Sequence, residues 1–178
     1  MRDLHLDRRQ LENLGLDFEL EIERYIMSKY PDSIVLHNLT IYSTKLEKDT
    51  QLDLVLLTNK CVYVIEAKNW VGYIKGEYND VYWEGKSRAR TNMKVFSPVN
   101  QNDIHIRALR NAIRLKGINP PMFKNLVVVP DGTSIKSHCQ EVVNRSRLLN
   151  VIEKNENISS DYIDKRKFAS IIREVCDE

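Results

Sequence analysis

Residues 51–68 constrain the fold of this chain more than any other segment. They contain two short apolar runs rich in Val, Leu and Ile, separated by the polar pair Asn59-Lys60. Apolar runs of this length on either side of a tight polar turn are typical of two β-strands in a hairpin. The sequence therefore predicts strands over residues 51–58 and 61–68, paired antiparallel.

The hairpin places charged side chains together. With a two-residue loop, Thr58 faces Cys61, and the same register brings Asp53 opposite Glu66. Lys68, two positions after Glu66, shares their face of the sheet. Two carboxylates held face to face cost stability, and the cost grows among apolar neighbours. A divalent cation bound between the two carboxylates would replace their repulsion by attraction to the metal. An oxygen-only ligand set favours Mg²⁺ or Mn²⁺ over zinc.

This arrangement suits hydrolysis of a phosphodiester. A metal held by Asp53 and Glu66 would lower the pKa of a bound water and polarise a phosphoryl oxygen. The ammonium of Lys68 would steer that water and offset the charge that develops in the transition state. The alternative is a solvated ion-pair cluster, because Asp, Glu and Lys at such loose spacing occur in many unrelated proteins. These three residues alone leave both interpretations open.

The rest of the chain alternates between predicted helices and strands. Apolar periodicity and capping residues predict helices over 7–29, over 98–116 with Ser97 as N-cap, and over 146–153 and 161–176. Further strands are expected at 33–40, in a hairpin of 73–78 with 81–84, and at 126–129, with a loop over 85–96. This order predicts an α/β fold with a single mixed central sheet flanked by helices, in one domain spanning 1–178.

Composition excludes several other classes of protein. Hydrophobic residues make up 42% and charged residues 29% of the chain, as in soluble globular proteins. No apolar run approaches the roughly 20 residues that a bilayer requires, so no membrane contact is expected. The N-terminal segment is charged, unlike a secretory signal. Three cysteines without CxxC spacing predict thiols in a reducing compartment, and hence a cytoplasmic location.

The net charge of +2 does not by itself indicate a nucleic-acid partner, so local basic groups carry that argument. One group lies in the predicted loop and comprises Lys86, Arg88, Arg90 and Lys94. A second lies along one face of the predicted helix and comprises Arg107, Arg110 and Arg114. Both would neutralise DNA phosphates in a salt-dependent manner, although for the helix group alone a solvated face is the preferred interpretation. No base-reading motif is present, so sequence specificity is not predicted.

A series of motifs adds a family resemblance: Thr50-Gln-Leu-Asp53, Val64-Ile-Glu66-Ala-Lys68-Asn-Trp70-Val-Gly72, Gly76, Trp83, and Pro98-Val-Asn-Gln101-Asn with His105. In order and spacing they resemble the nuclease-related domain (NERD) family over about residues 15–130. The resemblance implies a restriction-endonuclease-like fold of the PD-(D/E)xK type and metal-dependent cleavage of DNA. It also implies that Asp53, Glu66 and Lys68 form the catalytic core. We interpret the Trp and Gly residues as serving packing and turns; the alternative for Trp83 is stacking on an unpaired base.

The resemblance extends the site to two helices. Gln101 matches the family's helix glutamine, which implies contact with the metal shell or the substrate phosphate; the alternative is a capping or solvent-facing side chain. The family's first helix carries a Gly-Glu pair, and the matching pair here is Phe18-Glu19, so the glycine is missing. Glu19 is expected as a third carboxylate ligand of the metal, in preference to Glu21 or Glu23.

The sequence thus predicts a Mg²⁺- or Mn²⁺-dependent nuclease acting on DNA. The rival interpretation is a catalytically inactive nuclease-like domain that binds nucleic acid or a protein. A third is a nuclease that needs a helicase or other nucleic-acid-processing protein, since the family often occurs fused to such modules. His105 is expected to pack or to contact phosphate. Residues 131–178 are predicted to be helical, and their helices would cover the sheet or form a homo-oligomer contact.

Overall fold

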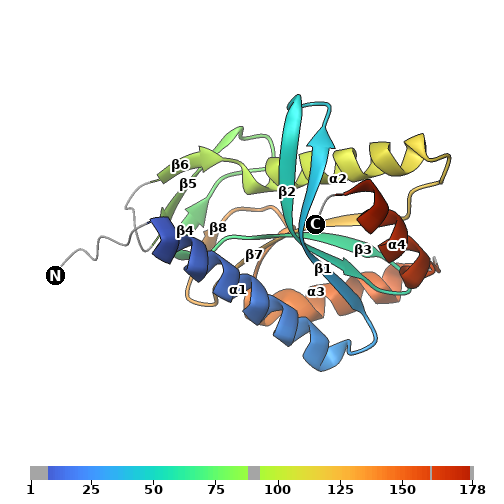
Figure 1. Ribbon diagram of the computed structural model, residues 1–178. Helices are drawn as coiled ribbons and strands as arrows, with labels where there is room; N and C mark the ends of the chain where they lie inside the picture. The colour runs from blue at the N-terminus through green and yellow to red at the C-terminus, as the bar shows by residue number, and fades with distance from the viewer. Residues whose placement is uncertain (1–7, 88–92, 161, 177–178) are drawn as a thin grey trace.

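A computed structural model describes residues 8–87, 93–160 and 162–176 of the chain (Figure 1). Along these residues the elements are α1 (Arg8–Lys29), β1 (Ile34–Ser43), β2 (Lys48–Leu57), β3 (Val62–Ala67), β4 (Trp70–Lys75), β5 (Tyr82–Ser87), β6 (Met93–Phe96), α2 (Pro98–Leu115), β7 (Phe123–Val129), β8 (Ser134–Lys136), β9 (Val142–Asn144), α3 (Arg145–Ile158) and α4 (Lys165–Val175).

A five-stranded mixed sheet forms the centre of the molecule, with strand order β1-β2-β3-β7-β9. The first three strands are antiparallel, and β7 and β9 run parallel to β3. Helices α1 and α3 cover one face, and α2 and α4 cover the other (Figure 1). The prediction of an α/β fold with a mixed sheet flanked by helices is therefore confirmed.

The apolar pattern of β2 and β3 follows from this layering. Because both faces of the sheet are covered, the strands read as continuous apolar runs instead of alternating ones. Leu54 and Tyr63 point into the core beneath α1 and α3, whereas Val55 and Val64 point into the core beneath α2 and α4. The sheet is thus filled on both sides, and polar groups at its end are enclosed by helices.

A second sheet, with strand order β6-β5-β4-β8, corrects the expectation of a single sheet. Its inner side chains pack against β7 and the start of α2. The predicted β4–β5 hairpin is confirmed. The predicted loop over 85–96 is wrong in part, because it contains the end of β5 and all of β6, while residues 88–92 lie outside the described part. Three-residue strands such as β8 and β9 are too short to leave a periodic signal.

Gly76 and Trp83 show how closely the second sheet is packed. Trp83 is buried, and its indole Nε1 donates to the carbonyl oxygen of Glu77 at 3.1 Å. A Cβ atom added at Gly76 would lie 2.3 Å from the Trp83 ring. Both residues therefore serve packing, as predicted, and Trp83 is not available to stack on a base.

We expect Gly76→Ala to lower the free energy of unfolding by about 1–3 kcal/mol, because overpacking forces the indole ring or the strand to move. Urea denaturation followed by circular dichroism measures the change. Gly132→Ala is the matched control, since its Cβ would meet no atom within 4 Å, and a change within about 0.5 kcal/mol is expected. Equal losses in the two variants would contradict the packing argument.

The segment after β7 supplies more than the predicted helices. Strand β8 joins the second sheet and β9 joins the main sheet before α3 and α4 begin. None of the described helices combines the length and apolarity needed to cross a membrane. Cys61, Cys139 and Cys176 are buried and form no disulfide, in agreement with the prediction of thiols.

Candidate active site

The site lies where β2 and β3 separate at the end of their ladder. Four residue pairs, ending with Leu54 opposite Ile65, follow the predicted register. Beyond the last pair, the backbone N–H of Ala67 donates to Oδ2 of Asp53 at 2.8 Å. This bond holds the carboxylate of Asp53 against the end of β3, beside Glu66.

Glu66, on β3, and Lys68, just after this strand, form a close ion pair. Glu66 is 1% exposed, and its Oε1 lies 2.5 Å from Nζ of Lys68. The other oxygen, Oε2, is buried and has no hydrogen-bond partner among the described residues. The Lys68 side chain is 22% exposed, so it reaches the surface. A buried carboxylate oxygen without a partner costs stability, and such an atom calls for an explanation other than packing.

Helix α2 brings Gln101 to this pair. Oγ of Ser97 accepts from the backbone N–H of Asn100 at 3.3 Å, and Pro98 is the first helical residue, as predicted. Gln101 therefore lies in the first turn, where its Oε1 accepts from Nζ of Lys68 at 3.4 Å. The structure thus brings together the four residues predicted as catalytic, although their roles remain predictions.

Helix α1 contributes Glu19. Its Oε2 is buried and also has no partner among the described residues. The two alternatives are engaged elsewhere: Glu21 pairs with Arg145 at 2.5 Å, and Glu23 pairs with His37 at 3.1 Å. The following residues are called the carboxylate cluster: Glu19, Asp53 and Glu66.

The cluster carries more negative charge than its surroundings can balance. Burial raises the pKa of Asp53 to about 7, with the charge of Glu66 adding to the shift and the N–H of Ala67 opposing it. Burial raises the pKa of Glu19 to about 7 as well, and the charge of Asp53 adds to it. Burial also raises the pKa of Glu66, although the charge of Lys68 opposes this. Protons or a cation are needed to neutralise the excess.

Lys68 is the cation already present. Burial alone would lower the pKa of its ammonium, but Glu66, Asp53 and Glu19 together outweigh burial and raise that pKa above its usual value. Lys68 therefore stays charged at neutral pH. A single ammonium among three carboxyl groups leaves negative charge uncompensated when all three are ionised.

His105 and Thr50 border the cluster on its α2 side. Nε2 of the buried His105 lies 2.9 Å from Oγ1 of Thr50, and its Nδ1 lies 3.6 Å from Oε2 of Glu66. Burial, together with the charge of Lys68, lowers the pKa of His105 to about 4, so the ring is neutral at physiological pH and does not pair with Glu66 as an ion. The predicted packing role of His105 fits this environment. Beyond its place in the motif, nothing in the sequence indicated that Thr50 contacts the site, because a lone threonine in a strand is common.

Asn102 fastens the start of α2 to the sheet. It is buried, and its Nδ2 donates to the carbonyl oxygens of Val64 at 2.7 Å and Leu126 at 3.1 Å. The same nitrogen lies 2.8 Å from Oδ1 of Asn125. One side chain thus ties α2 to β3 and β7, and it positions the neighbouring Gln101. No role for Asn102 follows from the sequence beyond its place in the motif.

The predicted nucleic-acid contacts fall in two regions. Lys86 on β5 and Lys94 on β6 are exposed on the second sheet, and Arg107 is exposed on α2. Arg110 stacks its guanidinium over the ring of Phe123 at 5.7 Å, so it also serves packing. Two of the predicted contacts lie outside the described residues: Arg88 and Arg90.

The residues of the site fit a divalent cation of the Mg²⁺ type. Within the described residues, no group of three or more His, Cys, Asp or Glu side chains is arranged so that it could hold a metal ion. Mg²⁺ commonly keeps several waters and takes only one or two protein carboxylates, so a partial set of oxygen ligands suffices. The donors available are hard oxygens, and the buried Oε2 atoms of Glu66 and Glu19 have no other partner among the described residues.

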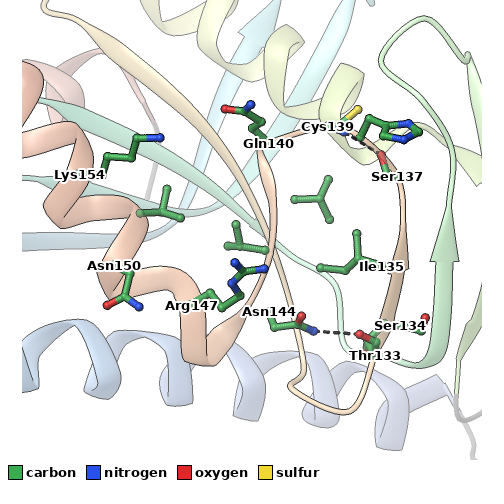
Figure 2. A pocket seen from close by; sticks show the side chains of 14 residues that line it. Thr133, Ser134, Ile135, Ser137, Cys139, Gln140, Asn144, Arg147, Asn150 and Lys154 are labelled. Carbon is green, nitrogen blue, oxygen red and sulfur yellow. Dashed lines mark hydrogen bonds between the residues drawn. The ribbon is translucent and has the colours of Figure 1, made fainter.

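A separate cleft of about 680 Å³ opens between α3 and the segment around β8 (Figure 2). Arg147, Asn150 and Lys154 border it on α3, and Ser134 and Ile135 border it on β8. No member of the carboxylate cluster lines this cleft. The predicted site therefore lies in a different part of the molecule from this concavity.

The raised pKa of Asp53 predicts how stability depends on pH. The folded state holds a proton on Asp53 up to about pH 7, whereas the usual value is 3.8. Stability therefore falls as pH rises between those two values, because in that range the folded state keeps a proton that the unfolded chain has released, so rising pH favours the unfolded chain. Asp53→Asn removes this penalty, while its side-chain oxygen can still accept from the N–H of Ala67.

We expect Asp53→Asn to raise the melting temperature at pH 8 without metal by roughly 5 °C, and to change it much less at pH 4. We expect Mg²⁺ to raise the melting temperature of the natural chain at pH 8 but not that of the variant. Differential scanning calorimetry at both pH values measures these shifts. Glu153→Gln, at an exposed ion pair on α3, is the control. A lower melting temperature for Asp53→Asn at pH 8 would contradict the excess of negative charge.

Comparison with known proteins identifies the family. The model of the nuclease-related domain family matches residues 14–130, which include every member of the carboxylate cluster as well as Lys68 and Gln101. An uncharacterized protein of Bacillus anthracis is 33% identical over 90 residues, and the alignment covers 49% of this chain and 41% of that relative. Because the family match extends over more than half of its residues, the chain belongs to the nuclease-related domain family.

Proposed function

We propose that this protein is a metal-dependent nuclease that hydrolyses phosphodiester bonds of DNA. Family membership supports a nuclease-like function in general. One observation carries the finer assignment: an oxygen of Glu66 that is buried and has no hydrogen-bond partner in the described part of the chain lies beside a charged lysine that reaches the surface. An oxygen kept free of hydrogen bonds in a cluster of acids is suited to hold a cation, and the adjacent ammonium is suited to meet a phosphate.

Asp53 and Glu66 would hold the metal, with Glu19 and the carbonyl oxygen of Ala67 as further oxygen ligands. When bound, Mg²⁺ or Mn²⁺ would make water more acidic and polarise a phosphoryl oxygen. The bond from the N–H of Ala67 keeps Asp53 in place for this role. The pKa values of Asp53 and Glu19, about 7 without metal, imply that metal uptake displaces protons and weakens below neutral pH.

Lys68 would act on the substrate directly. Its ammonium stays protonated, so it donates hydrogen bonds and does not act as a base. It would orient the attacking water and stabilise the charge that builds on the phosphoryl oxygens. Gln101 accepts one hydrogen bond from Nζ and so limits the directions in which the ammonium can point. Lys68 is therefore the proposed electrostatic catalyst, with Gln101 assisting it.

The exposed cations would hold the nucleic acid. Lys86, Lys94 and Arg107 are available to phosphates in the structure, and Arg88, Arg90 and Arg110 complete the proposed set. Contacts to phosphates position a strand without reading its sequence. A helicase or other nucleic-acid-processing partner, a homo-oligomer and a cytoplasmic location remain predictions.

A second candidate function is a binding module without catalysis. The observation that favours it is the 2.5 Å contact between Lys68 and Glu66, which already offsets one carboxylate without any metal. In such a module the cluster would be a remnant, and nucleic acid or a protein would bind equally well without divalent ions.

The two candidates differ in their response to metal. Labelled linear and supercoiled DNA are incubated with the protein in Mg²⁺, in Mn²⁺ and in EDTA, and isothermal titration calorimetry measures Mn²⁺ uptake separately. The nuclease proposal expects products only with metal, and Mn²⁺ uptake that Asp53→Asn abolishes. Binding without products, equally tight in EDTA, together with no detectable Mn²⁺ uptake, would favour the binding module and overturn the nuclease.

A further inference from the structure

The solvent face of the second sheet has an unusual composition. Side chains alternate along β5 and β6, so that Trp83 and Val95 point into the core while their neighbours point outward. Among the outward residues are Tyr82, 57% exposed, and Phe96, 40% exposed, which are directly paired across the two strands. Their rings meet edge to face with centroids 6.5 Å apart. Contiguous exposed apolar groups mark interaction sites on proteins, and this aromatic pair is a candidate for one.

The same face carries cations next to the rings. Nζ of Lys94 lies 5.3 Å from the centre of the Tyr82 ring. Across the sheet, Nζ of Lys136 on β8 lies 5.0 Å from the centre of the Tyr73 ring on β4. Each pair presents a flat ring and an ammonium side by side. A nucleotide carries the two matching parts, a flat base and a charged phosphate.

The charge of the face is strongly one-sided. Among the described strand residues that point outward on this face, the one acid, Glu84, pairs with Lys75 at 3.6 Å, so that these two charges cancel. Three further lysines, Lys86, Lys94 and Lys136, are exposed. We call the rings and these three cations the aromatic platform: Tyr73, Tyr82, Phe96, Lys86, Lys94 and Lys136. An excess of cations favours a polyanion over an apolar or basic protein partner.

The platform is connected to the site at both of its ends. Strand β4 begins at Trp70, two residues after Lys68, and β6 ends at Phe96, five residues before Gln101. Three of the four strands of the second sheet, β4, β5 and β6, are thus inserted between the two segments that carry Lys68 and Gln101. A nucleic-acid strand that binds to β4, β5 and β6 would therefore contact the segment of chain that directly joins Lys68 to Gln101.

We propose that the aromatic platform binds single-stranded nucleic acid, with bases stacked on the rings and phosphates on the lysines. In a duplex the bases are stacked on one another and offer only their edges, so the rings would gain nothing. Aromatic residues interleaved with cations are the general means of holding an unpaired strand without reading its sequence. The inference rests on the proposed nuclease function only for treating this strand as the substrate.

Fluorescence anisotropy in EDTA tests the binding step apart from cleavage. The probes are a fluorescein-labelled dT20 and a labelled 20-base-pair duplex. We expect the natural chain to bind dT20 more tightly than the duplex at 150 mM salt. The double variant Tyr82→Ala/Phe96→Ala is expected to weaken dT20 binding at least tenfold, since two stacking sites are lost. Its far-UV circular dichroism should be unchanged, because both side chains are exposed.

Matched variants separate the platform from general surface effects. Tyr42→Ala/Tyr162→Ala removes two exposed rings elsewhere on the molecule and should leave dT20 binding unchanged. Lys94→Gln/Lys136→Gln should reduce the slope of log K against log salt concentration by about 1.4, because each phosphate contact on a single strand contributes roughly 0.7. The control Lys45→Gln/Lys48→Gln, at the exposed turn between β1 and β2, should leave the slope unchanged.

Failure of this inference and failure of the nuclease proposal give different results. Loss of dT20 binding in the platform variants, with no cleavage by any form of the protein, supports the platform and overturns the nuclease. Cleavage by the natural chain, with platform variants that bind and cut as well as it does, overturns the platform alone. Duplex binding as tight as dT20 binding, or no nucleic-acid binding in EDTA, also overturns the platform, and in the latter case points to a protein partner.

Discussion

Replacing Lys68 by methionine should reduce the rate constant for DNA cleavage by about 10²–10³-fold, the usual effect of removing one donor aimed at transition-state charge. Methionine keeps much of the length and apolar stem of lysine but neither donates nor carries charge. The loss should appear in kcat with little change in KM, because phosphate contacts elsewhere still bind the substrate. Single-turnover cleavage of a labelled strand at saturating Mg²⁺ measures the chemical step directly.

Lys48→Met is the control for this prediction, since Lys48 is exposed on β2 at the turn that follows β1. Glu66→Gln should also reduce the rate constant strongly, and the double variant Glu66→Gln/Lys68→Met should be no slower than the slower single variant, because the two groups act as one unit. Full cleavage by Lys68→Met, or cleavage that survives Asp53→Asn, would show that these residues do not form the catalytic centre.

Replacing Asn102 by leucine should lower the free energy of unfolding by about 3–6 kcal/mol. Leucine fills a similar volume but removes the two N–H donors that the carbonyl oxygens of Val64 and Leu126 and the side-chain oxygen of Asn125 share. A buried acceptor that loses its donor costs about 1–3 kcal/mol. This is the largest stability effect that we expect from a single polar substitution here. Urea denaturation with the midpoint and slope both fitted measures it.

Asn111→Leu, on the exposed side of the same helix, provides the control and should change stability by no more than about 0.5 kcal/mol. Asn102→Leu should in addition reduce cleavage, because Gln101 loses the anchor that positions the first turn of α2. A variant as stable as the natural chain would mean that the start of α2 is held by its apolar contacts alone.

The hairpin of β2 and β3 could be predicted because its determinants are local. A two-residue turn and two apolar strands set the register, and the register decides which side chains are neighbours. Four observed pairs agree with it. The start of α2 could be predicted for the same reason, since the residues that determine it, Ser97 and Pro98, lie at the beginning of the helix itself. For these elements the chain needs no distant contact to choose its conformation.

Other features depend on segments far apart in the sequence. The second sheet requires β8 to lie beside β4, some 60 positions earlier, as with Ile74 opposite Ile135, and no short-range pattern encodes such a pairing. The inward direction of Glu19 is set by the packing of α1 on the main sheet, which matters because the glycine expected before it is absent. Asn102 gains its three partners only when α2 meets β3 and β7.

The sequence by itself determined the hairpin, the placement of Asp53, Glu66 and Lys68 along it, and the family resemblance, because these depend on neighbours along the chain. Only the tertiary structure decided that Glu66 keeps a buried oxygen free of partners within the described residues. The same holds for the neutral state of His105 and for the gathering of rings and lysines on one face of the second sheet. Burial and charge are properties of the space around a side chain, and that space forms only when helices and sheets close over it.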